Sequence, residues 1–324
     1  MAQVLVMGGA GYIGSHTVKH LLDSGYRVVV ADNLACGHLE AVDKRADFVQ
    51  ADLLDPASLA RVFAQYKIEA VIHFAALTAV GESVQEPQKY YLNNVVGTLN
   101  LLRVMLEHNV KNIVFSSTCA TYGNPQYIPL DEKHPQSPIN PYGETKRIVE
   151  QILKDYAGTY DLRYMALRYF NAAGAAADGS LGESHNPPTH LIPLVLQAIK
   201  GERSTLNVFG DDYDTPDGTC IRDYIHVEDL ALAHRLALEK LPEYTGCINL
   251  GTGAGTSVKE IIQVAEEITG RKCPVRYAKR RAGDASRLLA DNRLAQEVLG
   301  WQPVYTQIKD IIQTAWNWEQ HKKY

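Results

Sequence analysis

The sequence predicts an α/β fold, in which a doubly wound parallel sheet with helices on both faces is followed by a smaller mixed α/β domain. In the first half, short apolar runs alternate with amphipathic helical stretches, which is typical of parallel strands joined by helices. Near Asn171 the residue composition changes, because residues 171–189 are too rich in Gly, Ala, Ser and Pro for a regular element. We therefore expect two domains, 1–170 and 171–324, and leave open that the chain crosses back into the first.

The expected elements follow the hydrophobic pattern in order. In the first domain they are strands at 4–7, 27–31, 47–50, 70–73, 112–117 and 162–167 and helices at 12–24, 56–66, 87–108 and 141–157. In the second they are helices at 191–200, 227–240, 258–269 and 307–320 and a strand at 206–209. We expect the second domain to face the carboxyl ends of the parallel strands, where ligands bind in open α/β sheets.

Composition limits the partners of the chain. The 324 residues carry a formal net charge of -5, so the chain lacks the basic footprint of a nucleic-acid-binding protein. No run approaches the roughly 18 apolar residues of a membrane span, and the start of the chain lacks the features of a signal peptide. Five scattered cysteines without CxxC spacing and eleven histidines without an HExxH pair indicate a cytoplasmic protein with no disulfide framework and no bound metal.

A glycine turn follows the first strand. The run from Gly8 through Gly11 to Gly14 leads directly into a helix, and small residues at these positions permit a tight turn and close approach of the backbone to a pyrophosphate. The second strand ends at Asp32, where a carboxylate binds the adenosine ribose hydroxyls and repels a 2′-phosphate. The sequence therefore predicts a Rossmann-type domain that binds NAD rather than NADP. Asp52 either contacts the adenine amino group or caps the 56–66 helix.

A second motif carries the expected chemistry. Asn140 and proline 141 indicate a helix start, so Tyr142 lies in the first turn and Lys146 lies one turn later on the same face. We expect the Lys146 ammonium, the helix dipole and the charge of oxidised nicotinamide to lower the pKa of the Tyr142 phenol together. Thr118, at the end of the fifth strand, is expected to hydrogen-bond the substrate oxygen and Tyr142. An exposed Tyr-xxx-Lys helix pair without function is the alternative.

These residues resemble the extended short-chain dehydrogenase/reductase superfamily and, within it, the UDP-galactose 4-epimerases. The resemblance runs along nearly the whole chain, through the motifs GGAGYIGSH (8–16), YYLNNVVGTLNLL (90–102), SPINPYGETK (137–146), LRYFNAAGA (167–175), DGTCIRDYIHVEDLA (217–231) and RRAGD (280–284). It implies reversible, NAD-dependent 4-epimerisation of UDP-glucose and UDP-galactose through a 4-keto intermediate. It also implies a homodimer, paired through the helices at 87–108 and 141–157.

The resemblance further implies the residues of each site. The catalytic set is Thr118, Tyr142 and Lys146. The NAD site adds Gly8, Gly11, Tyr12, Ile13, Gly14, Asp32, Asn33, Asp52, Leu53, Phe74, Ala75, Asn94, Ser116 and Tyr169. The substrate site adds Asn171, His190, Leu191, Phe209, Arg222, Tyr224, Arg281, Asp284 and Leu288.

Three residues depart from the family pattern. Thr78 replaces a lysine near the cofactor ribose, His190 replaces an asparagine, and Leu288 has an intermediate bulk that leaves tolerance of N-acetylhexosamines open. Epimerases of UDP-pentoses or UDP-N-acetylhexosamines are the nearest alternatives. A 4,6-dehydratase is disfavoured, because Cys119 follows Thr118 where that enzyme carries an Asp-Glu pair. A non-catalytic NAD-sensing protein is disfavoured because Tyr, Lys and the strand-end hydroxyl are all present.

Overall fold

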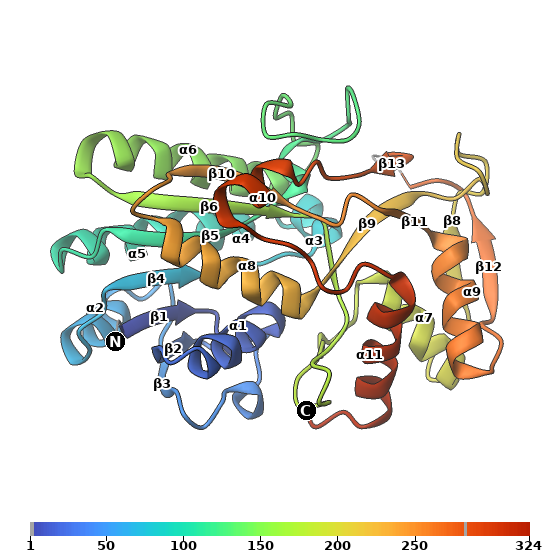
Figure 1. Cartoon of the computed structure of the whole chain (residues 1–324), viewed down its shortest axis with the longest axis horizontal. Coiled ribbons are helices and arrows are strands. Elements are labelled where there is room, and N and C mark those ends of the chain that lie inside the picture. The colour runs from blue at the N-terminus through green and yellow to red at the C-terminus, as the bar shows by residue number, and fades with distance from the viewer. Residues whose placement is uncertain (1–2, 282–283) are drawn as a thin grey trace.

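The larger of two lobes is built on a seven-stranded parallel sheet (Figure 1). In this computed structural model, which describes residues 3–281 and 284–324, the strand order is β10-β6-β5-β4-β1-β2-β3. The strands are β1 (Gln3–Met7), β2 (Arg27–Asp32), β3 (Asp47–Gln50), β4 (Ala70–His73), β5 (Asn112–Thr118), β6 (Arg163–Tyr169) and β10 (Gly246–Leu250). The order reverses at β1, which pairs with β2 on one side and β4 on the other. The predicted doubly wound fold is confirmed.

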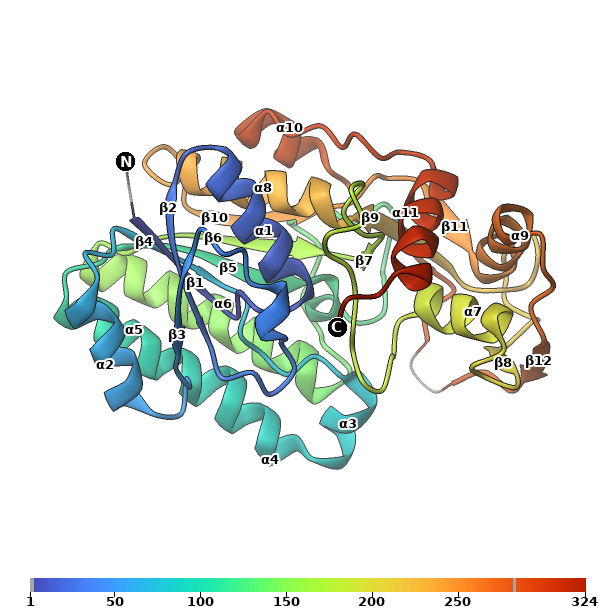
Figure 2. The same ribbon diagram turned by 90° about the horizontal axis from the view of Figure 1, so that it is seen from below.

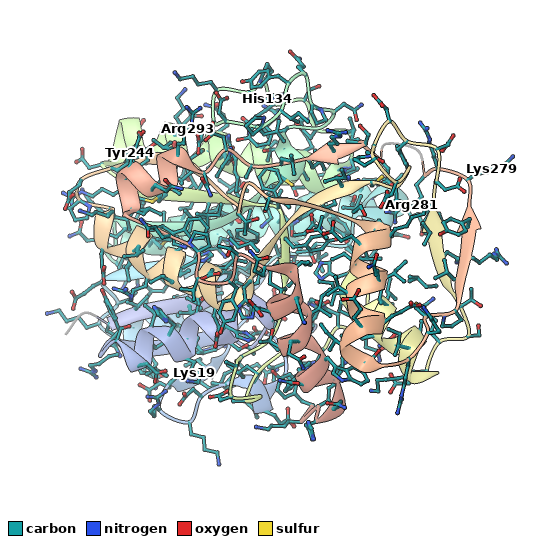
Figure 3. All side chains as sticks on the ribbon, turned by 45° about the vertical axis from the view of Figure 1, so that its right-hand side comes forward. Lys19, His134, Tyr244, Lys279, Arg281 and Arg293 are labelled. Atoms are coloured by element: carbon teal, nitrogen blue, oxygen red, sulfur yellow. The ribbon has the colours of Figure 1, made fainter. Side chains whose placement is uncertain are left out.

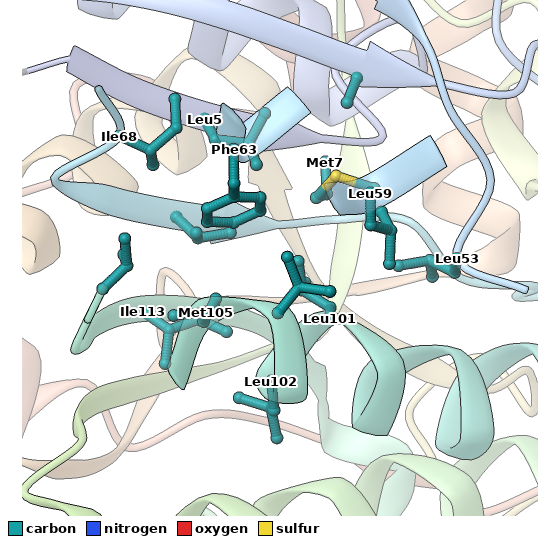
Figure 4. Packing of buried hydrophobic residues seen from close by; sticks show 14 of the residues in the cluster. Leu5, Met7, Leu53, Leu59, Phe63, Ile68, Leu101, Leu102, Met105 and Ile113 are labelled. Atoms are coloured by element: carbon teal, nitrogen blue, oxygen red, sulfur yellow. The ribbon is translucent and has the colours of Figure 1, made fainter. Parts of the chain in front are cut away.

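Helices cover both faces of this sheet (Figure 2). One face packs against α2 (Pro56–Gln65), α5 (Gly97–Glu107) and α6 (Pro141–Tyr160), and the other against α1 (Tyr12–Asp23), α8 (Val227–Lys240) and α10 (Arg293–Leu299). Successive strand residues point to opposite faces, so Leu5 and Met7 enter one core and Val4 and Val6 the other. Figure 4 shows the first of these cores, where Leu5 and Met7 lie near side chains of α2 and α5.

The described residues of the smaller lobe form two short sheets and three helices. A four-stranded sheet joins β7 (Asn171–Ala173), β9 (Ile221–His226), β11 (Gly255–Ser257) and β13 (Arg287–Leu288), while β8 (Leu206–Phe209) pairs with β12 (Val275–Ala278). The helices are α7 (Leu191–Lys200), α9 (Val258–Thr269) and α11 (Ile308–Gln320). Their apolar faces share one core, which includes Ile192, Leu196, Ile261, Ile312 and Trp316.

The chain passes between the lobes more than once. After β9 it enters α8, which packs against α1, and then β10, which pairs in parallel with β6. Residues 227–250 therefore complete the larger lobe, although they follow part of the smaller one. None of the helices in the described ranges is long and apolar enough to cross a membrane.

Two sequence expectations were wrong in detail. The single helix expected at 87–108 is divided into α4 (Pro87–Tyr90), a π-helical stretch at Tyr91–Val96 and α5. A π turn accommodates an extra residue, and the buried Asn94 within it accepts from Leu77 N (2.8 Å) and donates to Thr145 Oγ1 (3.1 Å). The segment 171–189, expected to hold no regular element, begins with β7, because its backbone pairs with β9.

Candidate active site

The glycine turn between β1 and α1 leaves open space at a helix N-terminus. A Cβ at Gly8 would lie 2.6 Å from Ala75 N, and one at Gly14 would lie 2.2 Å from Gly8 O, so the fold itself requires both glycines. At Gly11, the N-cap of α1, a Cβ would meet only Gly8 O, at 3.4 Å. The packing of the protein therefore does not require glycine at position 11, and the space beside it is open. The first-turn N–H groups of α1 face this space, which fits a pyrophosphate.

Asp32 lies beside the turn at the end of β2. Its side chain is buried, with Oδ2 accepting from Ala10 N (3.0 Å) and Oδ1 from Leu34 N (2.8 Å). Burial raises the pKa of this carboxyl, and the backbone N–H groups oppose that effect. Asn33 donates from Nδ2 to Asp52 Oδ2 at 2.9 Å, so the expected adenine-side residues lie together.

The alternative role for Asp52 is wrong. The N-cap of α2 is Asp55, whose carboxylate accepts from Ala57 N at 3.1 Å, while Asp52 accepts from Leu54 N at 2.7 Å. Asp52 is therefore available beside Asn33 as a ligand-binding group. This arrangement of the glycine turn, Asp32 and Asp52 fits a dinucleotide.

The first turn of α6 carries Tyr142. As predicted, Asn140 caps this helix, accepting from Gly143 N at 2.8 Å, and proline 141 begins it. Burial raises the pKa of the Tyr142 phenol to about 12, and a hydrogen bond with Thr118 opposes the shift. Tyr142 and Thr118 therefore lie together at the carboxyl end of β5, as the sequence analysis expected.

Lys146 lies one turn further along α6 and is almost fully buried. Its Nζ donates to Ser116 O at 2.7 Å and lies 4.7 Å from the centroid of the Phe115 ring. Burial lowers the pKa of Lys146 to about 7, and the negative charge of Glu150 opposes this. The direct effect expected of Lys146 on the phenol is not among the causes of the Tyr142 pKa shift, whose largest cause is burial.

The remaining cofactor-side residues surround this centre. Phe74 N and Ala75 N both donate to Met7 O, at 2.8 and 3.0 Å, so the end of β4 lies against the glycine turn. The Ser116 hydroxyl is hydrogen-bonded to the Tyr169 hydroxyl across β5 and β6. Thr78, the residue in place of the family lysine, is exposed.

The substrate-side residues form two groups in the smaller lobe. In the first, Arg222 and Arg281 both approach Asp284, at 3.8 and 2.9 Å, and Arg281 (labelled in Figure 3) lies over the Phe209 ring at 4.8 Å from its centroid. Leu288 pairs with Arg222 in the β13–β9 ladder and packs beside Tyr122 and Phe170. Of the RRAGD motif, Ala282 and Gly283 lie outside the described residues.

The second group lines a cavity between α7, α11 and the β7–β9 ladder. Asn171 pairs with Tyr224 in that ladder, and both residues line the cavity with His190 and Leu191. The cavity also contains Glu183, which the sequence analysis did not single out. Arg222 and Tyr224 are two residues apart on β9, so their side chains leave the same face of the sheet and connect the two groups.

A buried ion pair and a buried acid near these sites were missed by the sequence analysis. Glu150 and Arg168 form a buried ion pair behind Lys146, and Glu183 accepts hydrogen bonds from two histidines. A signal existed for Glu183, since an acid in a Gly/Pro-rich segment is followed by histidines two and seven residues later. Glu150 lies four residues after Lys146, hence on the same face of α6.

Known proteins share both the sequence and the structure of the chain. The NAD dependent epimerase/dehydratase family matches residues 4–251. The UDP-glucose 4-epimerase of Halalkalibacterium halodurans is 52% identical over 323 residues, covering 99% of this chain and 96% of that protein. The crystal structure of UDP-glucose 4-epimerase from Brucella ovis in complex with NAD has a TM-score of 0.95 at 55% identity, covering 98% of each chain. The enzyme from Bifidobacterium longum in complex with NAD+ and UDP has a TM-score of 0.94 at 41% identity, covering 99% of each chain.

These similarities extend over the full length of the chain and agree with its glycine turn and with the hydroxyl pair on β5 and α6. The chain belongs to the NAD dependent epimerase/dehydratase family.

Proposed function

We propose that this chain is an NAD-dependent UDP-glucose 4-epimerase that interconverts UDP-glucose and UDP-galactose through a 4-keto intermediate. The observation that carries the proposal is the position of Tyr142, whose turn of α6 packs against the end of β5 and so brings the phenol beside Thr118. These groups lie at the carboxyl edge of a sheet whose first βα turn fits a dinucleotide. Relatives about 50% identical over their full length are UDP-glucose 4-epimerases.

The first lobe holds the cofactor in this proposal. The N-terminus of α1 binds the pyrophosphate, Asp32 the adenosine ribose, and Asn33 and Asp52 the adenine. Leu53, Phe74, Ala75, Asn94 and the Ser116–Tyr169 pair line the rest of the site. When bound, NAD accepts a hydride from C4 of the sugar and returns it to the opposite face. The structural neighbour from Brucella ovis, which has the same fold, is complexed with NAD.

Tyr142 moves the proton. Its phenolate takes the proton of the sugar 4-hydroxyl, and the phenol gives it back when the carbonyl is reduced, while Thr118 hydrogen-bonds the same oxygen. Lowering the pKa of Tyr142 from about 12 to neutrality requires roughly 7 kcal/mol of preferential stabilisation of the phenolate. One cation supplies about 1–3 pKa units. A single cation is therefore insufficient, and because Lys146 is not among the causes of the Tyr142 shift, the base depends on the positive charge that arrives with the oxidised cofactor.

The smaller lobe holds the nucleotide-sugar. Arg222 and Arg281 present guanidinium groups that suit a diphosphate, and Phe209 offers a partly exposed ring beside Arg281. We assign Asn171, His190, Leu191, Tyr224, Asp284 and Leu288 to the same ligand. The sugar is left free to turn over between the two half-reactions, while the nucleotide end remains bound.

We further propose that the chain works as a homodimer in the cytoplasm. Exposed apolar side chains gather on α3 (Val80–Gln85) and the π-helical stretch, and they are Val80, Val84, Tyr91, Leu92 and Val96. A row of this kind, next to α5 and α6, suits a twofold interface between two copies.

The test replaces the phenol and keeps the ring. Purified Tyr142→Phe, incubated with UDP-galactose and no added NAD, is expected to lose turnover by at least about 10²–10⁴-fold while retaining bound NAD, because only the proton-transfer group is gone. Chromatography of the sugar nucleotide and of NAD released on denaturation measures both. Tyr160→Phe, which alters an exposed tyrosine of the same helix, is the control. Near-normal activity of Tyr142→Phe would contradict the mechanism, and a 4-keto-6-deoxy product would indicate a dehydratase.

A further inference from the structure

Glu183 is a buried acid with two imidazole donors. Its side chain is only 7% exposed, and one carboxylate oxygen, Oε1, accepts from Nδ1 of His185 and from Nδ1 of His190, each at 2.8 Å. The backbone around it is fixed, because Trp318 Nε1 donates to Glu183 O at 2.9 Å. The carboxylate therefore holds both rings from a rigid position.

His190 stands between this acid and the substrate cavity. Because Nδ1 is used by Glu183, the opposite ring nitrogen Nε2 is left for another partner, and the side chain is 43% exposed. His190 lines the cavity with Asn171 and Tyr224 and is the N-cap of α7, with no side-chain bond to that helix. The partly exposed ring thus lies at the same cavity as the first turn of α7, where Leu191 and Ile192 have N–H groups without a helical partner and Pro193 has none.

We propose that Glu183 is a positioning residue, which holds His190 as an imidazolium so that the free Nε2–H of His190 donates a hydrogen bond to the diphosphate of the UDP-sugar. This inference rests on the proposed function, because it names a determinant of substrate affinity in the same site. A neutral imidazole offers one donor, so with Nδ1–H bound to Glu183 its Nε2 would present a lone pair to the phosphate oxygens. Only the protonated ring donates to both partners, and a donor to phosphate that carries charge is the stronger one.

Electrostatics supports the charged form. The two histidines hold the pKa of Glu183 at about 2 despite its burial. Burial lowers the pKa of His190, but the charge of Glu183 and its hydrogen bond outweigh this and raise that pKa above its ordinary value. The other titratable groups around the cavity are His185 on the same loop, Tyr224 on β9 and Glu319 on α11. Tyr12 of α1 meets the His185 ring edge-on at 6.3 Å.

The second acid at the cavity is already neutralised. Lys322 Nζ lies 2.8 Å from Glu319 Oε1, and Lys200 Nζ lies 3.6 Å from Oε2. Glu183 is thus the acid that sets the charge of His190. Affinity for a diphosphate is therefore expected to be full below the raised pKa of His190 and to fall as the pH rises through it. The rate of the bound complex should not change, because neither residue contacts Tyr142 or Thr118 in this arrangement.

The experiment measures binding separately from turnover. Isothermal titration of NAD-loaded protein with UDP and with uridine, from pH 6 to 9, is expected to show weakening of UDP alone as the pH rises. Glu183→Gln should weaken UDP about tenfold at pH 7, the size of one charge-assisted hydrogen bond, without changing uridine. His190→Asn should remove the pH dependence. In steady state Glu183→Gln should raise KM and leave kcat. Glu297→Gln, which changes an exposed acid on α10 in the larger lobe, is the matched control.

A double variant keeps the proposal falsifiable if Glu183→Gln simply disturbs the loop. When Glu183 acts only through His190, adding Glu183→Gln to His190→Asn changes UDP affinity no further. Additive losses, equal losses for uridine, or a pH-independent wild type would overturn the proposal. So would UDP affinity that disappears on adding EDTA, because Glu183, His185 and His190 would then act by holding a metal ion. Failure of the proposed function is a separate result, since the wild type would then not epimerise UDP-galactose whatever its affinity for UDP.

Discussion

The glycine turn separates what the fold needs from what a ligand needs, residue by residue. Gly8 and Gly14 touch the backbone of the protein so closely that no side chain fits, and Gly8 also has a φ of +80°. Gly11 is different, because only Gly8 O lies within 4 Å of its added Cβ. The absence of a side chain at position 11 therefore leaves space for the pyrophosphate, and is not needed for the packing of the protein itself.

Two alanine substitutions should separate these roles. Gly14→Ala is expected to cost about 2 kcal/mol or more in the free energy of unfolding, because its Cβ would overlap Gly8 O. Gly11→Ala should cost at most about 1 kcal/mol yet purify without NAD. Urea denaturation and NAD content measure the two effects, with Gly158→Ala, at an exposed position of α6 where an added Cβ meets nothing within 4 Å, as a control. Retention of NAD by Gly11→Ala would show that the pyrophosphate lies elsewhere.

At the scale of elements, α6 is fastened to the sheet by a buried ion pair. Glu150 accepts from Arg168 Nε (2.8 Å) and Nη2 (2.6 Å), from Ser117 Oγ (2.5 Å) and from Gln136 Nε2 (2.7 Å). The helix that carries Tyr142 and Lys146 is thereby tied to both β5 and β6. Its position relative to the strand ends depends on polar contacts that lie behind the site.

Removing one partner of this pair should be costly. Arg168→Met leaves the Glu150 charge buried without its cation, for an expected loss of about 3–5 kcal/mol. The double change Glu150→Leu with Arg168→Met should recover part of that loss. Glu144→Gln, in the more exposed pair with Arg147, should cost under about 1 kcal/mol. The midpoints of urea denaturation measure these losses of stability. A small loss for Arg168→Met would mean that water reaches the Glu150 carboxylate.

Local patterns predicted the parts of the site that depend on local chemistry. The glycine turn, the acid at the end of β2 and the Asn-Pro start of α6 are set by backbone geometry within a few residues. The π-helical stretch was missed because it depends on a contact with Thr145, which is distant in the sequence. Glu183 has a local signal in the two histidines that follow it, but its burial depends on distant residues of α11 such as Trp318. The return of β10 to the first sheet is likewise invisible in residues 246–250 alone.

Across the described residues, four of the buried histidines make the fold sensitive to acid. Burial lowers the pKa of His16 and His234 to about 4 and of His73 and His226 to about 3. They lie on α1, α8, β4 and β9, so they occur in both lobes. Each is neutral in the folded state and gains a proton on unfolding below its ordinary pKa of about 6.5. Their contribution to stability is therefore full above that pH and is lost as the pH falls toward 4. The raised pKa of His190 acts in the opposite direction.

Thermal unfolding should reveal this dependence. We expect the midpoint to fall as the pH is lowered from 7 to 5, because each histidine lowers the free energy of unfolding by up to about 1.4 kcal/mol per pH unit. His234→Gln should flatten the profile over that range, even if it lowers stability at pH 7. His321→Gln, at an exposed histidine, should leave the slope unchanged. A midpoint that does not vary between pH 7 and 5 would contradict the assignment of these rings as neutral.

The pairing of β10 with β6 has a consequence for how the protein is made. While the ribosome is still synthesising residues 171–245, the nascent sheet ends at β6, with one edge unpaired and α1 not yet covered by α8. The expected NAD-site residues all precede residue 170, but the sheet that positions them keeps an open edge until β10 has left the exit tunnel. We therefore expect translation arrested before Gly246 to yield a fragment that aggregates or recruits chaperones, and not a separate nucleotide-binding domain.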